Sequence, residues 1–433
     1  MSSQCMQLLA LLLSFTVCQC ERASSLTTVH QGLELFAKNL LKEIVHEENE
    51  DGRYNQNLVV SPLGVWSLLA VIAEGASGNT ESQLKATLNL PSDAGIVRRG
   101  YRSIWKAILH ANRSSTTLEC ANAIFSDANR PLLPDFEYLA ETHYGATVRG
   151  VQLHNPPAAA ETINSWVSSA THDRIRNVIS ASDIVDAEII MGNAVFFQGA
   201  WALPFNSTFT VNRPFYADYR RERLPPSGKS GLRQHDAVEE MVVASVPMMY
   251  QSGPFKFAVI DALKAQILEL PYEGGELSML VALPKKGTSL AEVFARLRNT
   301  TLDTLLQMLE SQSSVDVEEG DVIDVFLPRF TINTRVQLKE HLEKLGLEDI
   351  FNVARSDLRK LSHSRLYVSK VLHQAEIKVA EEGTVASAVT VATINNFSMP
   401  TVFNANHPFL FIVIEKTTKA IIFAGKVSNP SIS

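Results

Sequence analysis

The chain has 433 residues, of which 45% are hydrophobic, so it can bury the core of at least one large domain. Its formal net charge of -7 argues against general binding to nucleic acid, because a polyanion would need a local basic patch. The 11 histidines and 4 cysteines form no cluster with metal-ligand spacing, so we expect neither a metal nor another cofactor.

The N-terminus carries an apolar run over residues 8–17, which is too short to span a bilayer but has the length of a secretory h-region. Small residues at Cys18 and Cys20 suit cleavage after Cys20, although the preceding residues carry no positive charge. We therefore predict a signal peptide over 1–20, a mature domain over 21–433 and a secreted, extracellular product. A buried N-terminal helix is the alternative, and no other apolar run is long enough to cross a membrane.

The predicted cleavage has consequences for cysteines and glycans. It would leave Cys120 as the single cysteine, in a β-prone stretch that favours a buried, inert thiol. Four Asn-x-Ser/Thr sequons would then be candidate glycosylation sites, namely Asn112, Asn206, Asn299 and Asn396.

Hydrophobic periodicity predicts helices and strands in alternation along the chain. An amphipathic helix over 33–45 comes first, and the stretch 57–84 follows with a short strand, a proline break and a helix buried on most sides. The later predicted elements are helices over 95–112, 131–145 and 336–345, a central strand within 187–204, and two strands around a Gly274-Gly275 turn.

Residues 219–240 are rich in charge, proline and glycine, and they are predicted to form an exposed insertion rather than a domain boundary. We find neither a repeat period nor a low-complexity linker, so the sequence favours one α+β domain, expected to be a monomer. The sequence contains no Gly-x-Ser-x-Gly elbow and no His-Glu-x-x-His motif, and we predict that the chain is not an enzyme.

Cationic residues recur at helical spacing in the predicted helix over 95–112. Arg98, Arg102 and Lys106 lie four residues apart, and Arg99 joins them, so they would form one basic face. Such a face could bind a heparin-like sulfated polysaccharide, while a simply solvated helix face is the alternative.

The stretch 381–400 reads EEGTVASAVTVATINNFSMP, and it combines a strand's sequence with a loop's tip. Alternate positions from Thr384 onward are small, and three of the intervening ones are valines, so the two sets would face opposite sides of a sheet. Because the segment lacks charge after Glu382, permanent exposure would make it prone to aggregation. We expect it to be buried in at least one state of the protein.

Several motifs in register resemble the serpins over essentially the whole chain. They are EEGTVASAVT, FNANHPFLFIVIE with IIFAGKVSNP, NAVFFQGAWALPF, SVPMM, VVSPLGVWSLLA and INSWV. The hinge and SVPMM look most like the plasminogen activator inhibitor and protease nexin group. The resemblance implies a fold of three β-sheets, about nine helices and an exposed reactive-centre loop at about 381–400, which inserts into the main sheet as an extra strand after a protease attacks it.

The scissile bond follows by counting within this resemblance. Seventeen residues from Glu381, and eleven back from Pro408, both lead to Phe397, so the inferred bond is Phe397-Ser398. Phe397 would fill a hydrophobic S1 pocket, which favours a chymotrypsin-like serine protease over a trypsin-like one. The protease would be trapped as a suicide complex, carried roughly 55 Å by the inserted strand.

The hinge is the segment whose residues would permit this insertion. In the resemblance it comprises Glu381, Glu382, Gly383, Thr384, Ala386 and Ala388. None of the small positions is replaced by a charge or a proline, so we predict inhibition rather than a non-inhibitory binding, carrier or chaperone role.

The resemblance also implies sites that control opening of the main sheet. It assigns Ser61, Asn193 and His373 to the shutter and Trp201 to the breach, positions that could equally be ordinary core residues. Two further positions depart from the family pattern: Gly64 stands where a second shutter serine is common, and Tyr250 where a lysine often pairs with Glu381.

Overall fold

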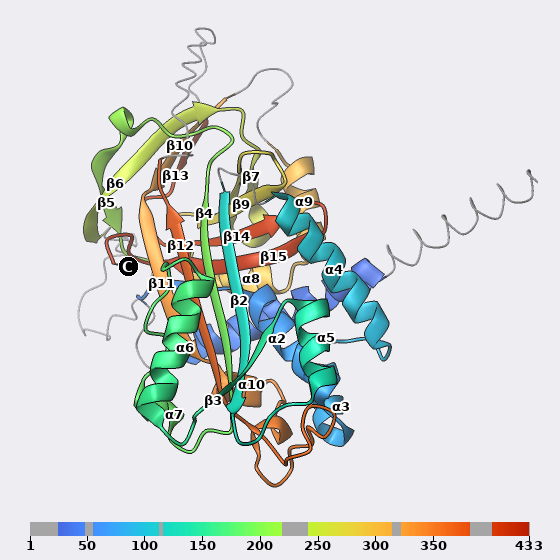
Figure 1. The fold of residues 1–433 in the computed structure, drawn as a ribbon. Coiled ribbons are helices and arrows are strands. Elements are labelled where there is room, and N and C mark those ends of the chain that lie inside the picture. The colour runs from blue at the N-terminus through green and yellow to red at the C-terminus, as the bar shows by residue number, and fades with distance from the viewer. Residues whose placement is uncertain are drawn as a thin grey trace, which may run out of the picture.

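The computed structural model describes residues 25–47, 55–111, 116–218, 241–313, 322–381 and 401–432. Within these ranges the chain forms three β-sheets surrounded by about ten helices, so the predicted mixed fold with three sheets is confirmed (Figure 1). The insertion predicted at 219–240 lies outside the described residues.

A five-stranded sheet runs along the length of the molecule in the order β11-β12-β4-β2-β3 (Figure 1). The predicted strand within 187–204 is confirmed as β4, which lies at its centre. Its strands are β2 (Thr116–Asp127), β3 (Thr147–Val151), β4 (Ile189–Gly199), β11 (Phe330–Gln337) and β12 (Val368–Val379).

Both faces of this sheet are covered, which explains the nearly continuous apolar sequence of β4. Phe196 packs on one side in a cluster with Ile163 of helix α6 (Pro156–Ala170). Its neighbour Phe197 points to the other side, where its ring lies 5.8 Å from that of Phe423 on a second sheet.

The second sheet has six strands in the order β1-β15-β14-β9-β8-β7, and β14 and β15 cross behind the first sheet in Figure 1. The predicted turn joins β8 and β9, and Gly274 and Gly275 have φ values of 91° and 78°, which glycine adopts without strain. The strands are β1 (Leu58–Val60), β7 (Phe257–Ile260), β8 (Ala265–Pro271), β9 (Leu277–Pro284), β14 (Phe409–Glu415) and β15 (Ala420–Val427).

The third sheet has four strands in the order β13-β10-β6-β5, and β13 runs parallel to β10. It lies at the same end of the molecule as the end of β12 (Figure 1). Its strands are β5 (Val211–Tyr216), β6 (Val242–Gly253), β10 (Ile323–Pro328) and β13 (Thr401–Asn404).

The helices begin where the sequence provides caps or prolines. Ser61 accepts a hydrogen bond from the Gly64 N–H to cap α2, of which all but Glu74 are buried. Residues 25–47 are helical, and the remaining helices are α2 (Pro62–Gly75), α3 (Gly78–Leu88), α4 (Ala94–Ala111), α5 (Pro134–Tyr144), α7 (Ala181–Ile184), α8 (Leu290–Arg298), α9 (Leu302–Ser311) and α10 (Lys339–Lys344).

Two predicted helices begin three residues later than the sequence suggested, α5 at Pro134 rather than at 131 and α10 at Lys339 rather than at 336. Residues 336 and 337 belong to β11, where Val336 pairs with His373 and Gln337 with Leu372. Helix α10 then starts at Lys339, so pairing with β12 overrides the helical spacing of the apolar residues.

Candidate functional site

The centre of the five-stranded sheet is a parallel pair, β12 beside β4, with an antiparallel neighbour on each side. The chain leaves β12 at Val379, and Glu381 is the last described residue before 382–400. A strand turning back from this point would run antiparallel to both β12 and β4. Such a strand would replace one parallel pairing with two antiparallel ones, which are slightly more stable per residue.

A row of buried polar side chains crosses this pair. His373 of β12 pairs in register with Asn193 of β4, and Asn193 with Asn122 of β2. His373 Nδ1 lies 2.7 Å from Asn193 Oδ1, and Asn193 Nδ2 donates to Asn122 Oδ1 at 2.6 Å. The hydrogen bonds thus connect three adjacent strands across the junction where insertion would occur.

Ser61 and Ser67, at the start of helix α2, bond to the two ends of this chain of hydrogen bonds. The Ser61 N–H donates to His373 Nε2 at 3.1 Å, so Nε2 carries no proton and Nδ1 donates to Asn193. At the other end Asn122 Nδ2 donates to Ser67 Oγ at 2.9 Å, and Ser67 donates to the Gly64 carbonyl. We call Ser61, Ser67, Asn122, Asn193 and His373 the polar row, which includes all three residues predicted for the shutter.

The presence of glycine at position 64 has a steric explanation in this arrangement. A Cβ at this position would lie 2.5 Å from the Asn193 side chain, so the serine that the family pattern suggests would collide with it. The departure seen in the sequence therefore accompanies the close approach of Asn193 to α2.

Burial fixes the protonation of the groups around the polar row. It lowers the pKa of His373 to about 3, which keeps the imidazole neutral. Burial also raises the pKa of the neighbouring Cys120 thiol to about 12, and its Sγ lies 3.8 Å from Asn193 Nδ2. Cys120 is half-buried rather than buried as the sequence suggested, and its raised pKa disfavours the reactive thiolate.

At the hinge end of β12, Trp201 holds the last residues before the loop. Its indole N–H donates to the Ala380 carbonyl at 2.9 Å, and its ring stacks on Tyr272 at 4.6 Å. Glu381, which is 5% exposed, forms an ion pair of 3.4 Å with Arg329.

Sequence reasoning missed Arg329 because it looked for a hinge partner at position 250. There, the Tyr250 hydroxyl instead donates to Asp324 at 3.1 Å. Arg329 lies between β10 and β11 at the edge of the hinge, and only the pairing of β11 with β12 brings it near Glu381. The available signal in the sequence was a positively charged residue, Arg329, within the strand-forming stretch 322–332.

The predicted basic face lies on α4, but its charges are not equivalent. Arg98 makes two hydrogen bonds of 2.8 Å to Glu74, which raise the pKa of its guanidinium and compensate its charge. Arg102 lies 3.2 Å from His143 Nδ1 and is exposed, as are Arg99 and Lys106. Three exposed cations therefore remain.

The other predicted site residues divide between exposed and undescribed positions. Asn206 and Asn299 are exposed. The following lie outside the described residues: the hinge positions Glu382, Gly383, Thr384, Ala386 and Ala388, the reactive bond Phe397-Ser398, and Asn112 and Asn396.

Within the described residues, no group of three or more His, Cys, Asp or Glu side chains could hold a metal ion. In the same part of the chain, none of the helices has both the length and the apolar composition needed to cross a membrane.

A family model described as Serpin (serine protease inhibitor) matches residues 31–430. The chain belongs to the serpin family. This serpin is thus related to inhibitors of serine proteases, a family that acts by inhibition and generally not as enzymes, and the resemblance found in its sequence is confirmed.

Individual relatives agree over nearly the whole chain. This serpin is similar to leukocyte elastase inhibitor A of Mus musculus, with 33% identity over 95% of this chain and 100% of the relative. It is also similar to the leukocyte elastase inhibitor of Homo sapiens, with 31% identity over 86% and 93% of the two chains. Among solved structures, native protease nexin-1 with heparin matches with a TM-score of 0.74 and 26% identity, covering 94% of this chain and 99% of that one. This neighbour also confirms the likeness to the protease nexin group.

The relatives correct the predicted localisation. Leukocyte elastase inhibitors are intracellular serpins and point to a cytoplasmic protein, so the prediction of a secreted, extracellular product is wrong. The missing positive charge before the apolar run over residues 8–17 was the feature of the sequence that argued against a signal peptide. The sequons lose the argument that made them glycosylation candidates, since that argument rested on the secretory route.

Proposed function

We propose that this serpin inhibits a chymotrypsin-like serine protease with a hydrophobic S1 pocket, as a monomer, after attack at Phe397-Ser398. The protease's own serine performs the chemistry. Residues 381–397 then insert between β12 and β4 and trap the acyl-enzyme.

The observation that carries this proposal is the parallel pairing of β12 with β4 directly before the hinge. This pairing would give an inserting strand two antiparallel neighbours, β12 and β4. Until insertion, the hydrogen bonds of the polar row and of Trp201 would hold β12 and β4 together. The apolar Phe397 supports the choice of protease, since a trypsin-like enzyme needs Arg or Lys in its Asp-lined pocket.

The test is incubation with chymotrypsin, followed by electrophoresis in SDS and sequencing of the released fragment. We expect a covalent complex and a fragment that begins at Ser398. Because the relatives are named elastase inhibitors, leukocyte elastase belongs in the same assay.

Two variants separate recognition from trapping. Phe397→Arg should transfer complex formation from chymotrypsin to trypsin, because only the S1 contact changes. Thr384→Arg should leave cleavage intact but prevent the complex, because a charge would have to enter the sheet. Clean cleavage of the wild type without a complex would instead support the non-inhibitory alternative, a binding, carrier or chaperone role.

Heparin binding is a second proposal, favoured by the structural neighbour that was solved with heparin. The exposed cations Arg99, Arg102 and Lys106 would supply the contacts, with Arg98 contributing less because of Glu74. We expect the triple alanine variant of the three exposed residues to elute from a heparin column at lower salt. Unchanged retention of that variant would rule this face out.

A further inference from the structure

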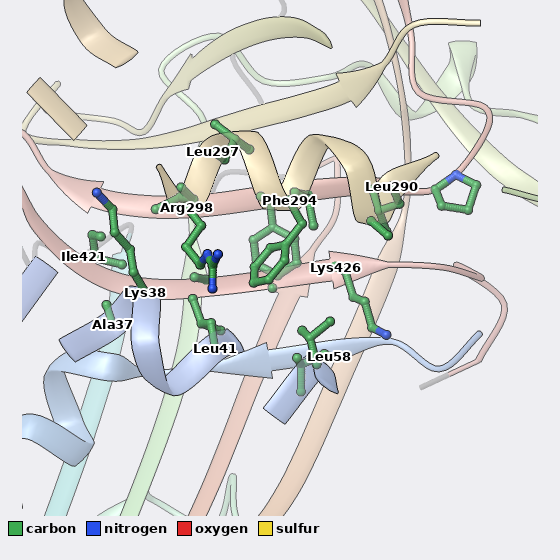
Figure 2. A pocket seen from close by; sticks show the side chains of 18 of the residues that line it. Ala37, Lys38, Leu41, Leu58, Leu290, Phe294, Leu297, Arg298, Ile421 and Lys426 are labelled. Atoms are coloured by element: carbon green, nitrogen blue, oxygen red, sulfur yellow. The ribbon is translucent and has the colours of Figure 1, made fainter. Parts of the chain in front are cut away.

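A cavity of about 640 Å³ lies at the hinge end of the five-stranded sheet, lined by the last residues of β12, the end of β4 and the start of β11. Its volume is within the range of small-molecule sites in proteins. It differs from a pocket of about 140 Å³ on the six-stranded sheet, where Figure 2 shows mainly apolar side chains such as Leu41, Phe294 and Leu297. The two share no lining residue, so the hinge cavity is a separate site.

Three polar side chains of the lining belong to one row across the sheet. Thr331 of β11 pairs in register with Lys378 of β12, and Lys378 pairs with Gln198 of β4. Side chains in register on adjacent strands project to the same face, and neighbouring strands lie about 4.8 Å apart. We call Thr331, Lys378 and Gln198 the hinge row, and all three are within reach of one small ligand.

The hinge row has no partners of its own. Within the described residues none of its three side chains takes part in a hydrogen bond or an ion pair. The row two residues farther from the hinge is engaged, since Asn333 Nδ2 donates to Glu376 Oε2 at 2.8 Å and Arg174 lies 5.0 Å from the Phe196 ring centre. The hinge row thus leaves an ammonium, an amide and a hydroxyl for a partner from outside.

The charges around the cavity favour a ligand with one negative charge. Arg329 in the lining is paired with Glu381 at 3.4 Å, so these two charges compensate each other. Lys378 is exposed, and it is the cation of the lining that this pair leaves uncompensated. An oxyanion suits the ammonium, whereas the amide of Gln198 and the hydroxyl of Thr331 can each donate to and accept from hydroxyl groups.

We propose that this cavity binds a small hydroxylated carboxylate of the sugar-acid type. Its carboxylate accepts a hydrogen bond from the Lys378 ammonium, and its hydroxyl groups bond to Gln198 and Thr331. The ligand thereby connects β12 with β4. One consequence rests on the proposed function: a strand inserted between β12 and β4 would separate Lys378 from Gln198, so the ligand would bind only before insertion.

Isothermal titration calorimetry with glucuronate tests the site on the full chain. We expect one molecule to bind per chain, and Lys378→Gln to weaken binding at least about tenfold, because a charge-assisted hydrogen bond is lost. Lys378→Arg should retain most of the affinity, because the charge remains. Lys370→Gln is the matched control, since Lys370 belongs to the same strand but lies outside the cavity lining, and its affinity should equal that of the wild type.

Glucose separates the charge from the hydroxyl groups, because it lacks the carboxylate of glucuronate. It should bind the wild type at least about tenfold more weakly than glucuronate does, and it should bind Lys378→Gln as it binds the wild type. No binding of glucuronate, or equal glucuronate affinity of the wild type and Lys378→Gln, would overturn the proposal.

The chymotrypsin assay tests the connection between the two strands. Saturating glucuronate should lower the fraction of wild type that ends in the covalent complex and raise the cleaved fraction, because the ligand must leave before insertion. Lys378→Gln should show no such change. An unchanged fraction in the wild type would overturn the bridging of β12 and β4. Absence of any complex, with the calorimetric results as expected, would refute the proposed inhibition and leave the ligand site supported.

Discussion

The β12–β4 pair is fastened in two places that differ in chemistry. The polar row crosses it as a directional chain of hydrogen bonds whose members are at most 5% exposed. At the hinge end the Trp201 N–H joins the end of β4 to that of β12, and an ion pair of 3.4 Å holds Glu381 from the β11 side, through an Arg329 side chain that is 52% exposed. A buried, hydrogen-bonded network resists partial opening, whereas a half-exposed ion pair does not. The pair should therefore open first at the hinge.

Removing the centre of the polar row should have the largest effect. Asn193→Ala deletes the acceptor of His373 Nδ1 and the donor to Asn122, which leaves two buried groups unsatisfied. We expect a loss of about 3 kcal/mol in the free energy of unfolding, measured with urea. Asn333→Ala is the control, since Asn333 is exposed on the neighbouring β11. Equal losses in the two variants would mean that the polar row has no special role.

Acid should weaken the polar row through His373. The pKa of its imidazole is lowered from 6.5 to about 3, so below pH 6.5 the unfolded chain binds a proton that the native chain excludes. The contribution of neutral His373 to the free energy of unfolding is thus fully present above pH 6.5. Below that pH the free energy of unfolding falls by about 1.4 kcal/mol per pH unit as the pH decreases toward 3. Urea midpoints from pH 7 to 5 should show this slope in the wild type and in the control His363→Gln. A His373→Gln variant that kept the slope would refute the assignment.

At the hinge, Trp201→Phe should cost about 1.5 kcal/mol, because the hydrogen bond to Ala380 is lost while most of the ring stacking on Tyr272 remains. Trp166→Phe on α6 is the matched control, since Trp166 contacts Phe125 through its ring. Melting temperatures of both variants provide the measurement. A smaller shift for Trp201→Phe than for the control would contradict this role.

The smallest effect is expected for the hinge ion pair. Arg329→Gln should lower the free energy of unfolding by about 1 kcal/mol or less, because the guanidinium is half-exposed. The contribution of the Arg329–Glu381 pair to stability should also decrease in 1 M salt. Arg335→Gln is the control, since it removes an exposed pair with Asp183 whose contribution should decrease to the same degree. A loss similar to that of Asn193→Ala would mean that the hinge is fastened as tightly as the polar row.

Local patterns were sufficient for much of the fold. The apolar run after Pro62 predicted the buried helix α2, and the apolar stretch within 187–204 predicted β4, because both signals are short-range. Asn122 and Ser67 were not found, since they join the polar row only through the register of β2 with β4 and the packing of α2. Such contacts depend on tertiary structure and leave no mark on sequence spacing.

The anchoring of β13 bears on how cleavage at the proposed bond Phe397-Ser398 would act. Thr401 to Asn404 pair with β10 in the four-stranded sheet, while the other end of the loop leaves β12 in the five-stranded one. An intact loop can insert fully only if β13 first detaches from β10. A cut after Phe397 lies upstream of Thr401 and leaves that pairing untouched. In the proposed mechanism, transfer of the Phe397 acyl group to the protease serine would break one peptide bond and so disconnect the two anchored ends of the loop, which would allow insertion without loss of the β13–β10 pairing.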